Sequence, residues 1–366
     1  MKNFTTRQII FLGILMGLTI TLVHAPAQAA EAAGQHTFLT PLPAALVLAF
    51  SVWVLSRIQR RFSGHDLFGA LITRFPIFGR LLVILYFVFN LVVLARDMRL
   101  LTDYVAITLL PLTPIIATAF CLLLTIIFMV RGGIVTLVGM AEIYIPFLIA
   151  TAIVMPIVLG KAMDFSLLLP VFHIHYSDFM RGSWNLLAYM GDLAVLPYVL
   201  PGKNYKIRSA LGGVLGCTLL LMILLLLQQT VLGPPITARL SFPSYEIARQ
   251  MQITDFLDRF DLLIAGMTLP TVIIKVGFDL YVLCSASRRL LPSVKGELTV
   301  LPVGILGFVC TFWFFENLPQ VFSFSKEWAV FVLFFYVLLP VVLLFMLHPK
   351  KEGRAEGDAQ PQPGQS

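Results

Sequence analysis

The sequence predicts an all-α polytopic membrane protein with ten transmembrane helices, arranged as two inverted halves of five helices with broken helices one and six. Composition is the first observation behind this fold class: 58% of the 366 residues are hydrophobic, 12% are charged, and the mean hydropathy is +0.90. A soluble core cannot hold that much apolar side chain, so a bilayer must cover the rest. The number of apolar stretches and the helix breakers within two of them are the other observations.

Ten stretches have the roughly 20 mostly apolar residues that a spanning helix needs. They cover residues 7–30, 39–58, 78–108, 114–131, 135–160, 182–201, 207–232, 255–288, 299–315 and 328–347. Residues 1–348 are therefore expected to form one membrane domain. The tail 349–366 is rich in Gly, Pro and Gln and is expected to be a disordered cytoplasmic segment, because it has too little apolar surface to order itself.

The placement of lysine and arginine predicts the orientation, because cytoplasmic loops retain positive charge. Most of the 26 basic residues fall in alternate connections, starting with the N-terminal segment. They are Lys2, Arg7, Arg57, Arg60, Arg61, Arg74, Arg80, Arg131, Lys203, Lys206, Arg208, Arg288, Arg289, Lys295, Lys350, Lys351 and Arg354. Both termini are therefore expected in the cytoplasm. The formal charge of +7 is interpreted as an orientation signal, and no nucleic-acid partner is expected.

The first span has two interpretations. A short basic beginning, the apolar run 9-IIFLGILMGL-18 and the sequence 27-AQA-29 fit a signal peptide with a cleavage site. The alternative is a membrane helix that breaks near His24, Ala25 and Pro26, because proline removes a backbone donor and disfavours helix at the preceding residue.

The sixth span has a similar interruption. It reads 182-GSWNLLAYMGDLAVLPYVLP-201, with Gly191 and Asp192 at its middle and Pro197 further on. Discontinuous helices at matching positions of two halves are typical of transporters with inverted repeats, and the open backbone groups line the binding site. This match favours the broken helix over the signal peptide.

Ionisable side chains within the spans are costly and usually face a partner or a cavity. They are Arg96, Asp97, Arg99 and Asp103 in the third span, Glu142 in the fifth, and Lys275 and Asp279 in the eighth. Arg99 with Asp103, and Lys275 with Asp279, have the i, i+4 spacing of helical ion pairs. The first pair either faces the bundle or lies in solvent at the outer end of its helix. The second is either a fixed strut or a protonatable element. Asp97, Asp103, Glu142 and Asp279 are expected to form a buried charge network.

The segment 232–264, between the seventh and eighth spans, alternates apolar and charged residues as a surface-lying amphipathic helix does. It is either a fixed external cap or a lid over an outward-facing pocket.

Three stretches identify a family. They are 241-SFPSYEIARQMQITDFLDRFD-261, 99-RLLTDYVAITLLPLTP-114 and 191-GDLAVLPYVLP-201. Together with the lysine of the eighth span, they resemble the B-type subunit of bacterial spore germinant receptors. This is the spore permease family within the amino acid/polyamine/organocation superfamily. The chain departs from the family pattern in 133-GIVTLVGMAE-142, where Val135 and Gly139 replace residues that the family often has.

The resemblance implies a ten-helix LeuT-like fold that binds a small nutrient germinant, typically an amino acid. It also implies signalling in the spore inner membrane to a polytopic A-type subunit and a C-type lipoprotein. A proton-coupled amino acid transporter is the alternative function, and a purely structural membrane anchor is a third.

The expected pocket lies between the two helix breaks, with walls from the third and eighth spans. Helix N-termini favour a carboxylate and C-terminal carbonyls favour an ammonium group, so an amino acid zwitterion suits such a gap. The expected ligand-binding residues are Thr21, His24, Ala25, Ala95, Arg99, Tyr189, Gly191, Asp192, Thr271, Lys275 and Phe278. No catalytic constellation or metal-ligand cluster is recognisable, so we expect no enzyme, no metal and no cofactor.

Overall fold

The computed structural model describes residues 4–62, 66–170, 175–200, 202, 205–249, 260–294 and 296–346, and its regular elements are all helical. The first half contains α1 (Thr6–Ala33), the 3₁₀ helix η1 (Gly34–Leu39), α2 (Pro41–Arg61), α3 (Leu67–Arg74), α4 (Pro76–Thr108), α5 (Ile115–Arg131) and α6 (Gly133–Val158). The 3₁₀ helix η2 (Phe165–Leu168) follows.

The second half begins with α7 (Tyr176–Met190), the 3₁₀ helix η3 (Gly191–Val195) and α8 (Leu196–Val199). It continues with α9 (Ile207–Val231), α10 (Pro234–Thr237), α11 (Pro243–Arg249), α12 (Phe260–Leu290), η4 (Gly296–Thr299) and α13 (Val300–Phe314). The chain then forms α14 (Leu318–Leu333), the π-helical turn η5 (Phe334–Leu338) and α15 (Leu339–Met346). The expected tail 349–366 and residues 250–259 of the outer segment lie outside the described residues.

Among the described residues, seven helical segments are long and apolar enough to cross a bilayer. They are Thr6–Leu39, Pro41–Arg61, Pro76–Thr108, Gly133–Val158, Ile207–Val231, Ala265–Leu290 and Leu318–Met346. The expected fourth and ninth spans are shorter apolar helices, α5 and α13. The sixth expected span is divided among α7, η3 and α8. Large apolar side chains cover the outside, including Leu112, Ile77 and Trp313, which are 99%, 87% and 77% exposed. Such a surface needs lipid around it, so the chain is an integral membrane protein.

Helix α1 does not break at Pro26, which corrects the sequence prediction. It remains α-helical from Thr6 to Ala33. Proline at this position leaves the Leu22 carbonyl without its usual N–H partner four residues on. The hydroxyl of Ser244 donates a hydrogen bond of 2.7 Å to that carbonyl. The unpaired backbone group is therefore satisfied from outside the helix, which removes the physical reason for the helix to open.

The second interruption is present. The α-helix α7 ends at Met190, and Gly191 begins the 3₁₀ segment η3. Gly191 also packs closely against α14, because a Cβ added there would lie 2.3 Å from Cγ1 of Val332. A side chain at this position would push α14 away from the interrupted helix.

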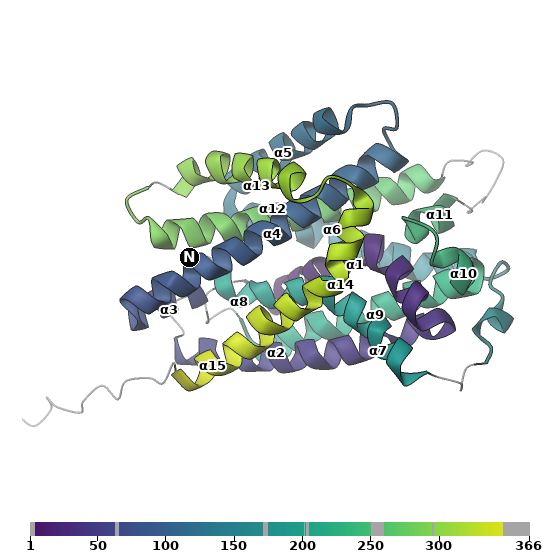
Figure 1. Cartoon of the computed structure of the whole chain (residues 1–366), viewed down its shortest axis with the longest axis horizontal. Coiled ribbons are helices and arrows are strands. Elements are labelled where there is room, and N and C mark those ends of the chain that lie inside the picture. The colour runs from purple at the N-terminus through teal and green to yellow at the C-terminus, as the bar shows by residue number, and fades with distance from the viewer. Residues whose placement is uncertain are drawn as a thin grey trace, which may run out of the picture.

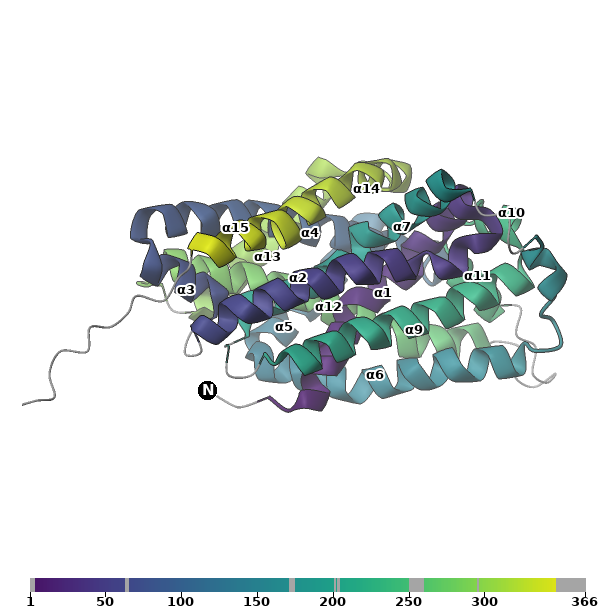
Figure 2. The ribbon, with the colours of Figure 1, turned by 90° about the horizontal axis from the view of Figure 1, so that it is seen from below.

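The helices pack in two groups on either side of α1, as Figure 1 shows. Helices α4, α5, α12 and α13 lie together on one side, and α2, α7 and α9 lie on the other. Helix α1 runs between them and contacts α6, α7, α9 and α12, which agrees with the turned view in Figure 2. Its approach to α9 is closest at Gly13, where an added Cβ would lie 2.8 Å from the Gly213 Cα. Small residues permit such backbone contact within membranes.

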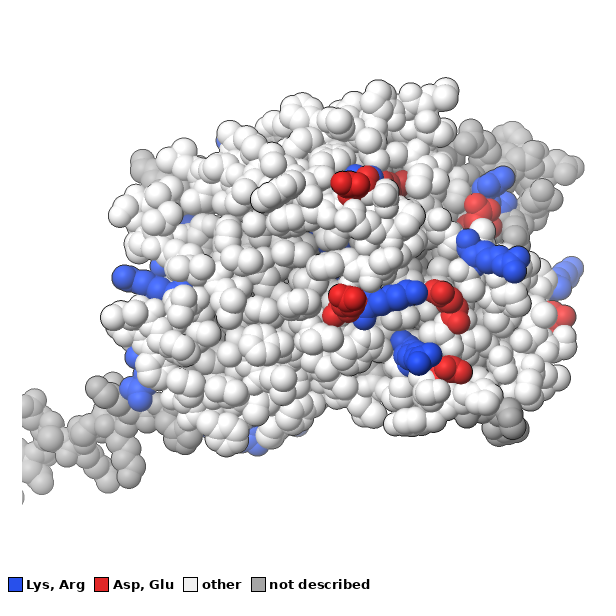
Figure 3. Space-filling model, viewed as in Figure 1, with Lys and Arg blue, Asp and Glu red and all other residues white. Residues whose placement is uncertain are grey.

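Figure 3 shows a broad area with few charged side chains beside the end that carries α3 and α15, whereas acidic and basic side chains lie at the middle of the face and beyond it. Lys and Arg appear without acidic neighbours towards the end that carries α3 and α15, whereas acidic and basic side chains appear together towards the α10 and α11 end. A broad area with few charged side chains is what a membrane-spanning surface requires.

Candidate functional site

Five ionisable side chains form a buried cluster between α4, η3 and α12. We call Arg96, Asp97, Asp192, Lys275 and Asp279 the charge cluster, and each residue is at most 3% exposed. Arg96 Nε lies 2.7 Å from Asp97 Oδ1, and its Nη2 lies 2.8 Å from Asp192 Oδ2. Lys275 Nζ lies 2.7 Å from Asp192 Oδ2 and 3.0 Å from Asp279 Oδ2, and it also pairs with Asp97. Lys275 therefore links three separate elements.

Arg96 is also fixed by neutral partners. Its Nη1 donates a hydrogen bond of 3.0 Å to the carbonyl of Ala188. This is the carbonyl that an uninterrupted α-helix would pair with the N–H of Asp192. The guanidinium lies over the ring of Tyr189, 4.9 Å from the ring centroid, and near Trp328 at 5.8 Å. A cation from α4 thus pairs with a backbone carbonyl at the point where the α-helix changes to a 3₁₀ helix.

The structure brings some residues of the expected charge network together with basic partners. Lys275 and Asp279 form the i, i+4 pair that their spacing predicts, and they are buried. Arg99 and Asp103 also pair, at 2.9 Å, and their side chains are 7% and 5% exposed. Arg99 Nη1 donates to the Phe315 carbonyl at 3.1 Å, so this pair faces the bundle separately from the charge cluster.

The sequence predicted that Glu142 is a buried acid of the charge network, and this prediction is wrong. Its side chain is 25% exposed, and its carboxylate pairs with Arg7 near the start of α1 and accepts a hydrogen bond of 2.9 Å from Gln8. Glu142 lies early in α6, where the N-terminal turns of α1 pass, so it reaches these polar residues and not the cations inside the bundle.

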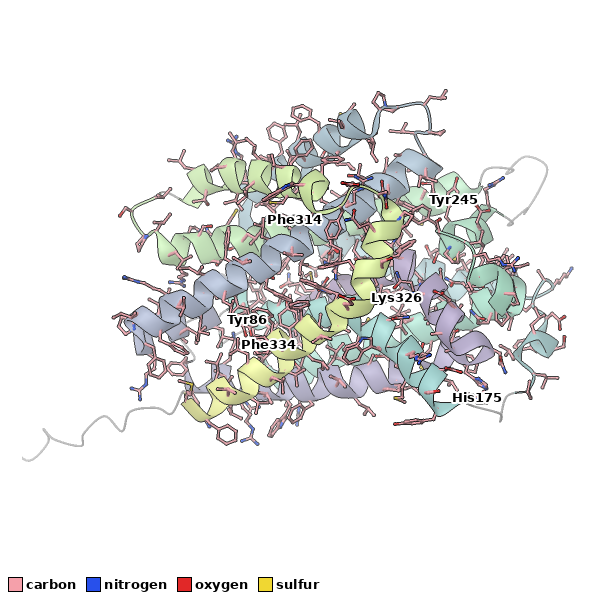
Figure 4. The ribbon with its side chains drawn as sticks, in the orientation of Figure 1. Tyr86, His175, Tyr245, Phe314, Lys326 and Phe334 are labelled. Carbon is pink, nitrogen blue, oxygen red and sulfur yellow. The ribbon has the colours of Figure 1, made fainter. Side chains whose placement is uncertain are left out.

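A cavity of about 50 Å³ lies beside α1 and beneath the segment that leads into α11. Its walls come from α1, α4, α6, α9, α11 and α12. The lining residues are Thr19, Leu22, Val23, Tyr104, Leu148, Thr151, Ala152, Met155, Leu224, Leu227, Gln228, Phe242, Ser244, Tyr245, Ile247, Thr268, Thr271 and Val272. Figure 4 shows Tyr245 at the edge of the bundle, on the side that carries α11. The described part of the outer segment therefore covers a pocket.

Polar groups converge on this cavity without any charged side chain in its lining. Gln228 Nε2 donates to the Ser244 hydroxyl at 2.9 Å, and Ser244 in turn donates to the Leu22 carbonyl of α1. Gln228 Oε1 is buried and has no hydrogen-bond partner among the described residues. A buried amide oxygen without a donor is costly, and this one belongs to a residue of the cavity lining.

The structure brings only one of the expected ligand-binding residues, Thr271, into this lining. Asp192 and Lys275 belong to the charge cluster. Arg99 pairs with Asp103, and Gly191 packs against α14. Tyr189 donates its hydroxyl to Ser325 at 2.7 Å.

The remaining expected residues are buried side chains outside the lining. Thr21 donates its hydroxyl to the Gly17 carbonyl, and Ala25, Ala95 and Phe278 are fully buried. His24 is also fully buried and lies beside Phe242 and Phe322, with ring centroids 5.3 and 6.0 Å away. Phe242 contacts this imidazole and also lines the cavity.

Sequence reasoning missed two parts of the site. Gln228 and Ser244 are uncharged residues on different elements, and nothing in their spacing predicts that they meet. Sequence reasoning also did not predict that Arg96 pairs with Asp192. The Asp192 carboxylate in the interrupted sixth span was the available signal for a cationic partner. Among the described residues, none of the His, Cys, Asp and Glu side chains form a group of three suited to a metal ion.

The arrangement defines an integral membrane protein with a transporter-type helical fold. The structure of Mhp1, a nucleobase-cation-symport-1 family transporter in a closed conformation with bromovinylhydantoin bound, is similar, with a TM-score of 0.66 and 12% identity. The likeness covers 93% of this chain and 76% of that chain. At this identity the likeness establishes the fold.

The chain belongs to the spore permease family, whose family model is described as "Spore germination protein" and matches residues 3–319. A Bacillus subtilis (strain 168) protein, named "Putative spore germination protein YfkT", is 27% identical over 351 residues. That alignment covers 96% of this chain and 98% of the relative. The resemblance noted in the sequence is thus confirmed at the level of the family.

Proposed function

We propose that this chain is the nutrient-sensing subunit of a spore germination receptor and binds a small molecule, typically an amino acid, in the cavity beneath α11. The observation that carries the proposal is the unpartnered Gln228 Oε1 in a buried cavity. An ammonium group can donate to this oxygen and to the hydroxyl oxygens of nearby Thr residues, such as Thr271. The apolar part of the lining suits a small side chain.

The small volume of the cavity links ligand binding to a conformational change. A volume of about 50 Å³ holds on the order of three or four water molecules. An amino acid is larger, so its binding requires the cavity to expand. Ser244 and Tyr245 on α11 form part of the wall, and Ser244 is hydrogen bonded to α1. Ligand binding would therefore favour a state with α11 displaced, and a partner subunit could read that displaced surface.

We also propose that the chain crosses the membrane ten times, in two inverted halves, with both termini in the cytoplasm. Helix contacts support this topology. If α1, α2, α4, α5 and α6 correspond to α7, α9, α12, α13 and α14, many helix contacts have a matching contact between the corresponding helices. Helix α1 contacts α9 as α7 contacts α2, and α4 contacts α13 as α12 contacts α5. The contact of α1 with α6 likewise matches that of α7 with α14. The basic side chains that Figure 3 shows near α3 and α15 support a cytoplasmic location for that end.

The cavity can be tested by filling it. Ala152 lies in the lining and is 1% exposed, whereas Ala150 on the same helix is exposed. In spores whose only receptor contains this chain, Ala152→Leu should abolish amino-acid-triggered germination, and Ala150→Leu should leave it intact. Membrane levels of both variants are measured alongside. A normal response of a well-expressed Ala152→Leu variant would contradict the proposed site.

A second variant keeps the test useful if Ala152→Leu does not fold. Gln228→Met has a similar volume but lacks the amide oxygen, so the ligand concentration needed for half-maximal germination should rise. The loss of one hydrogen bond to a charged donor corresponds to roughly 1.5–3 kcal/mol, or about tenfold or more in that concentration.

The proposed partners are a polytopic A-type subunit and a C-type lipoprotein of the spore inner membrane. Cross-linking in that membrane, followed by recovery of a tagged copy, tests this assembly. Stoichiometric recovery of both proteins supports the receptor. Recovery of this chain alone after efficient cross-linking would favour the alternative, a proton-coupled amino acid transporter. Saturable, pH-dependent uptake into sealed vesicles would then be the measurement that supports transport.

A further inference from the structure

The charge cluster does not balance its own charge. It contains three carboxyl groups, Asp97, Asp192 and Asp279, but only two cations, Arg96 and Lys275. If all three carboxyl groups were ionised, one negative charge would be in excess in a region where the side chains are at most 4% exposed. An uncompensated charge in such surroundings is so costly that proteins avoid it by taking up a proton or an ion.

The cluster also has an unused oxygen. Asp192 Oδ1 is buried and has no hydrogen-bond partner among the described residues, although its Oδ2 accepts from two cations. An additional proton or donor can therefore enter the cluster without displacing an existing contact. This observation is independent of the charge count.

The three carboxyl groups differ in how many charged donors they have. Asp97 accepts from Arg96 with Oδ1 and from Lys275 with Oδ2, so both of its oxygens are occupied. Asp192 accepts from the same two cations with one oxygen. Among the described residues, Asp279 accepts from Lys275 alone, at 3.0 Å. Since hydrogen bonds from cations stabilise the ionised form, Asp279 has the least such stabilisation.

We infer that the charge cluster is a proton-binding site, in which one exchangeable proton resides on the Asp279 carboxyl group when the chain is at neutral pH. The proton makes the cluster electrically neutral, with Asp97 and Asp192 ionised. The inference goes beyond the proposed function and holds whether the chain senses or transports its ligand.

Other groups around the cluster could in principle carry the compensating charge. They are His24 on α1, Tyr189 on α7, Tyr336 in η5, and Tyr86 and Tyr198 next to Tyr336. The tyrosines are neutral in their ordinary state and add no positive charge. An imidazolium at His24 would need acceptors for two N–H groups, yet its ring is flanked by Phe242 and Phe322, and the described residues offer at most one acceptor, the backbone at Leu100. Asp279 therefore remains the best-supported position.

Infrared spectroscopy of the full chain in lipid nanodiscs tests the assignment, because a protonated carboxyl group has a C=O stretching band separate from that of a carboxylate. At neutral pH, the wild-type protein should have this band, with a shift in D₂O. Asp279→Asn should abolish it. Asp103→Asn is the matched control, because Asp103 is a buried carboxylate in a one-to-one pair with Arg99, and it should leave the band unchanged.

A second variant tests the charge count itself. Lys275→Met removes one cation and raises the excess to two negative charges, so the band should grow to about twice its area, one further proton being bound. If this variant does not fold, Asp279→Asn still decides the position of the proton.

Three results would overturn the inference: no carboxylic acid band in the wild type, a band that persists in Asp279→Asn, or loss of the band in Asp103→Asn. Binding of one sodium ion per chain, measured with radioactive sodium at neutral pH, would likewise overturn it. In that case a metal cation and not a proton compensates the excess charge.

Discussion

The first helices of the two halves differ in how they accommodate a helix-breaking sequence. Helix α1 continues through Pro26, and the carbonyl that proline leaves unpaired accepts one hydrogen bond from Ser244. Helix α7 stops at Met190, and the Ala188 carbonyl accepts a hydrogen bond from the Arg96 guanidinium. The comparison teaches that a breaker alone does not open a membrane helix. The α-helix changes to a 3₁₀ helix where a charged side chain from another element binds a backbone carbonyl.

The largest loss of stability should come from removing the Arg96 guanidinium. Arg96→Leu leaves Asp97 and Asp192 without one of their two cations and frees the Ala188 carbonyl. Breaking a buried ion pair costs about 3–5 kcal/mol, so the variant should unfold at a much lower temperature or fail to accumulate. Thermal unfolding in detergent, followed by size-exclusion chromatography, measures this. Arg181→Leu, which removes an exposed cation, should unfold almost as the wild type does. Equal stability of the two variants would contradict a structural role for Arg96.

A smaller effect is expected from Gly191→Ala at the start of the interruption. The added Cβ would meet Val332 of α14 at 2.3 Å, and overpacking of this kind typically costs about 1–3 kcal/mol. The control is Gly139→Ala in α6, where an added Cβ has no neighbour within 4 Å. This control should be neutral or slightly stabilising, because alanine is the better helix former. A Gly191→Ala variant as stable as the control would mean that α14 moves without cost.

The hydrogen bond from Ser244 to the Leu22 carbonyl can be removed, and a bond within α1 can replace it. Ser244→Ala removes the donor to Leu22 and should cost about 1–3 kcal/mol, because a buried carbonyl is left unsatisfied. Pro26→Ala restores an N–H that can pair with the same carbonyl within the helix. The double variant should therefore be more stable than the sum of the two single effects predicts. Strict additivity in this double-mutant cycle would show that the hydroxyl does not compensate for the proline.

The smallest effect should come from the exposed start of α1. Arg7 and Glu142 pair there, but their side chains are 68% and 25% exposed. Exposed pairs of this kind contribute little to stability, so Glu142→Gln should change the unfolding temperature little, and even that small change should vanish at high salt. A large, salt-independent loss of stability would contradict the surface position of this pair.

Local sequence patterns predicted the structural features that depend on residues close together in the chain. The spacing of Lys275 and Asp279 was sufficient to predict their pair, and the Gly-Asp sequence at residue 191 was sufficient to predict the interruption of α7. Apolar stretches likewise predicted the positions of the long helices. These features follow from helical periodicity and backbone preference, which a single sequence contains.

Contacts between distant elements could not be predicted in the same way. Ser244 reaches Leu22 across most of the chain, so the sequence around Pro26 gave no sign that the helix would be supported. Arg96 and Asp192 are 96 positions apart, so no local spacing predicted their pair. The cavity depends on how six helices pack around Gln228, and no residue spacing encodes that packing.

The most direct test of the account is equilibrium binding of radiolabelled amino acids to the purified chain in nanodiscs. The account predicts saturable binding of at least one amino acid to the wild type and to Ala150→Leu, and loss of that binding in Ala152→Leu. Binding that survives in a folded Ala152→Leu variant would contradict the cavity as the site. Absence of saturable binding to the wild type across the whole panel would contradict a sensor of amino acids.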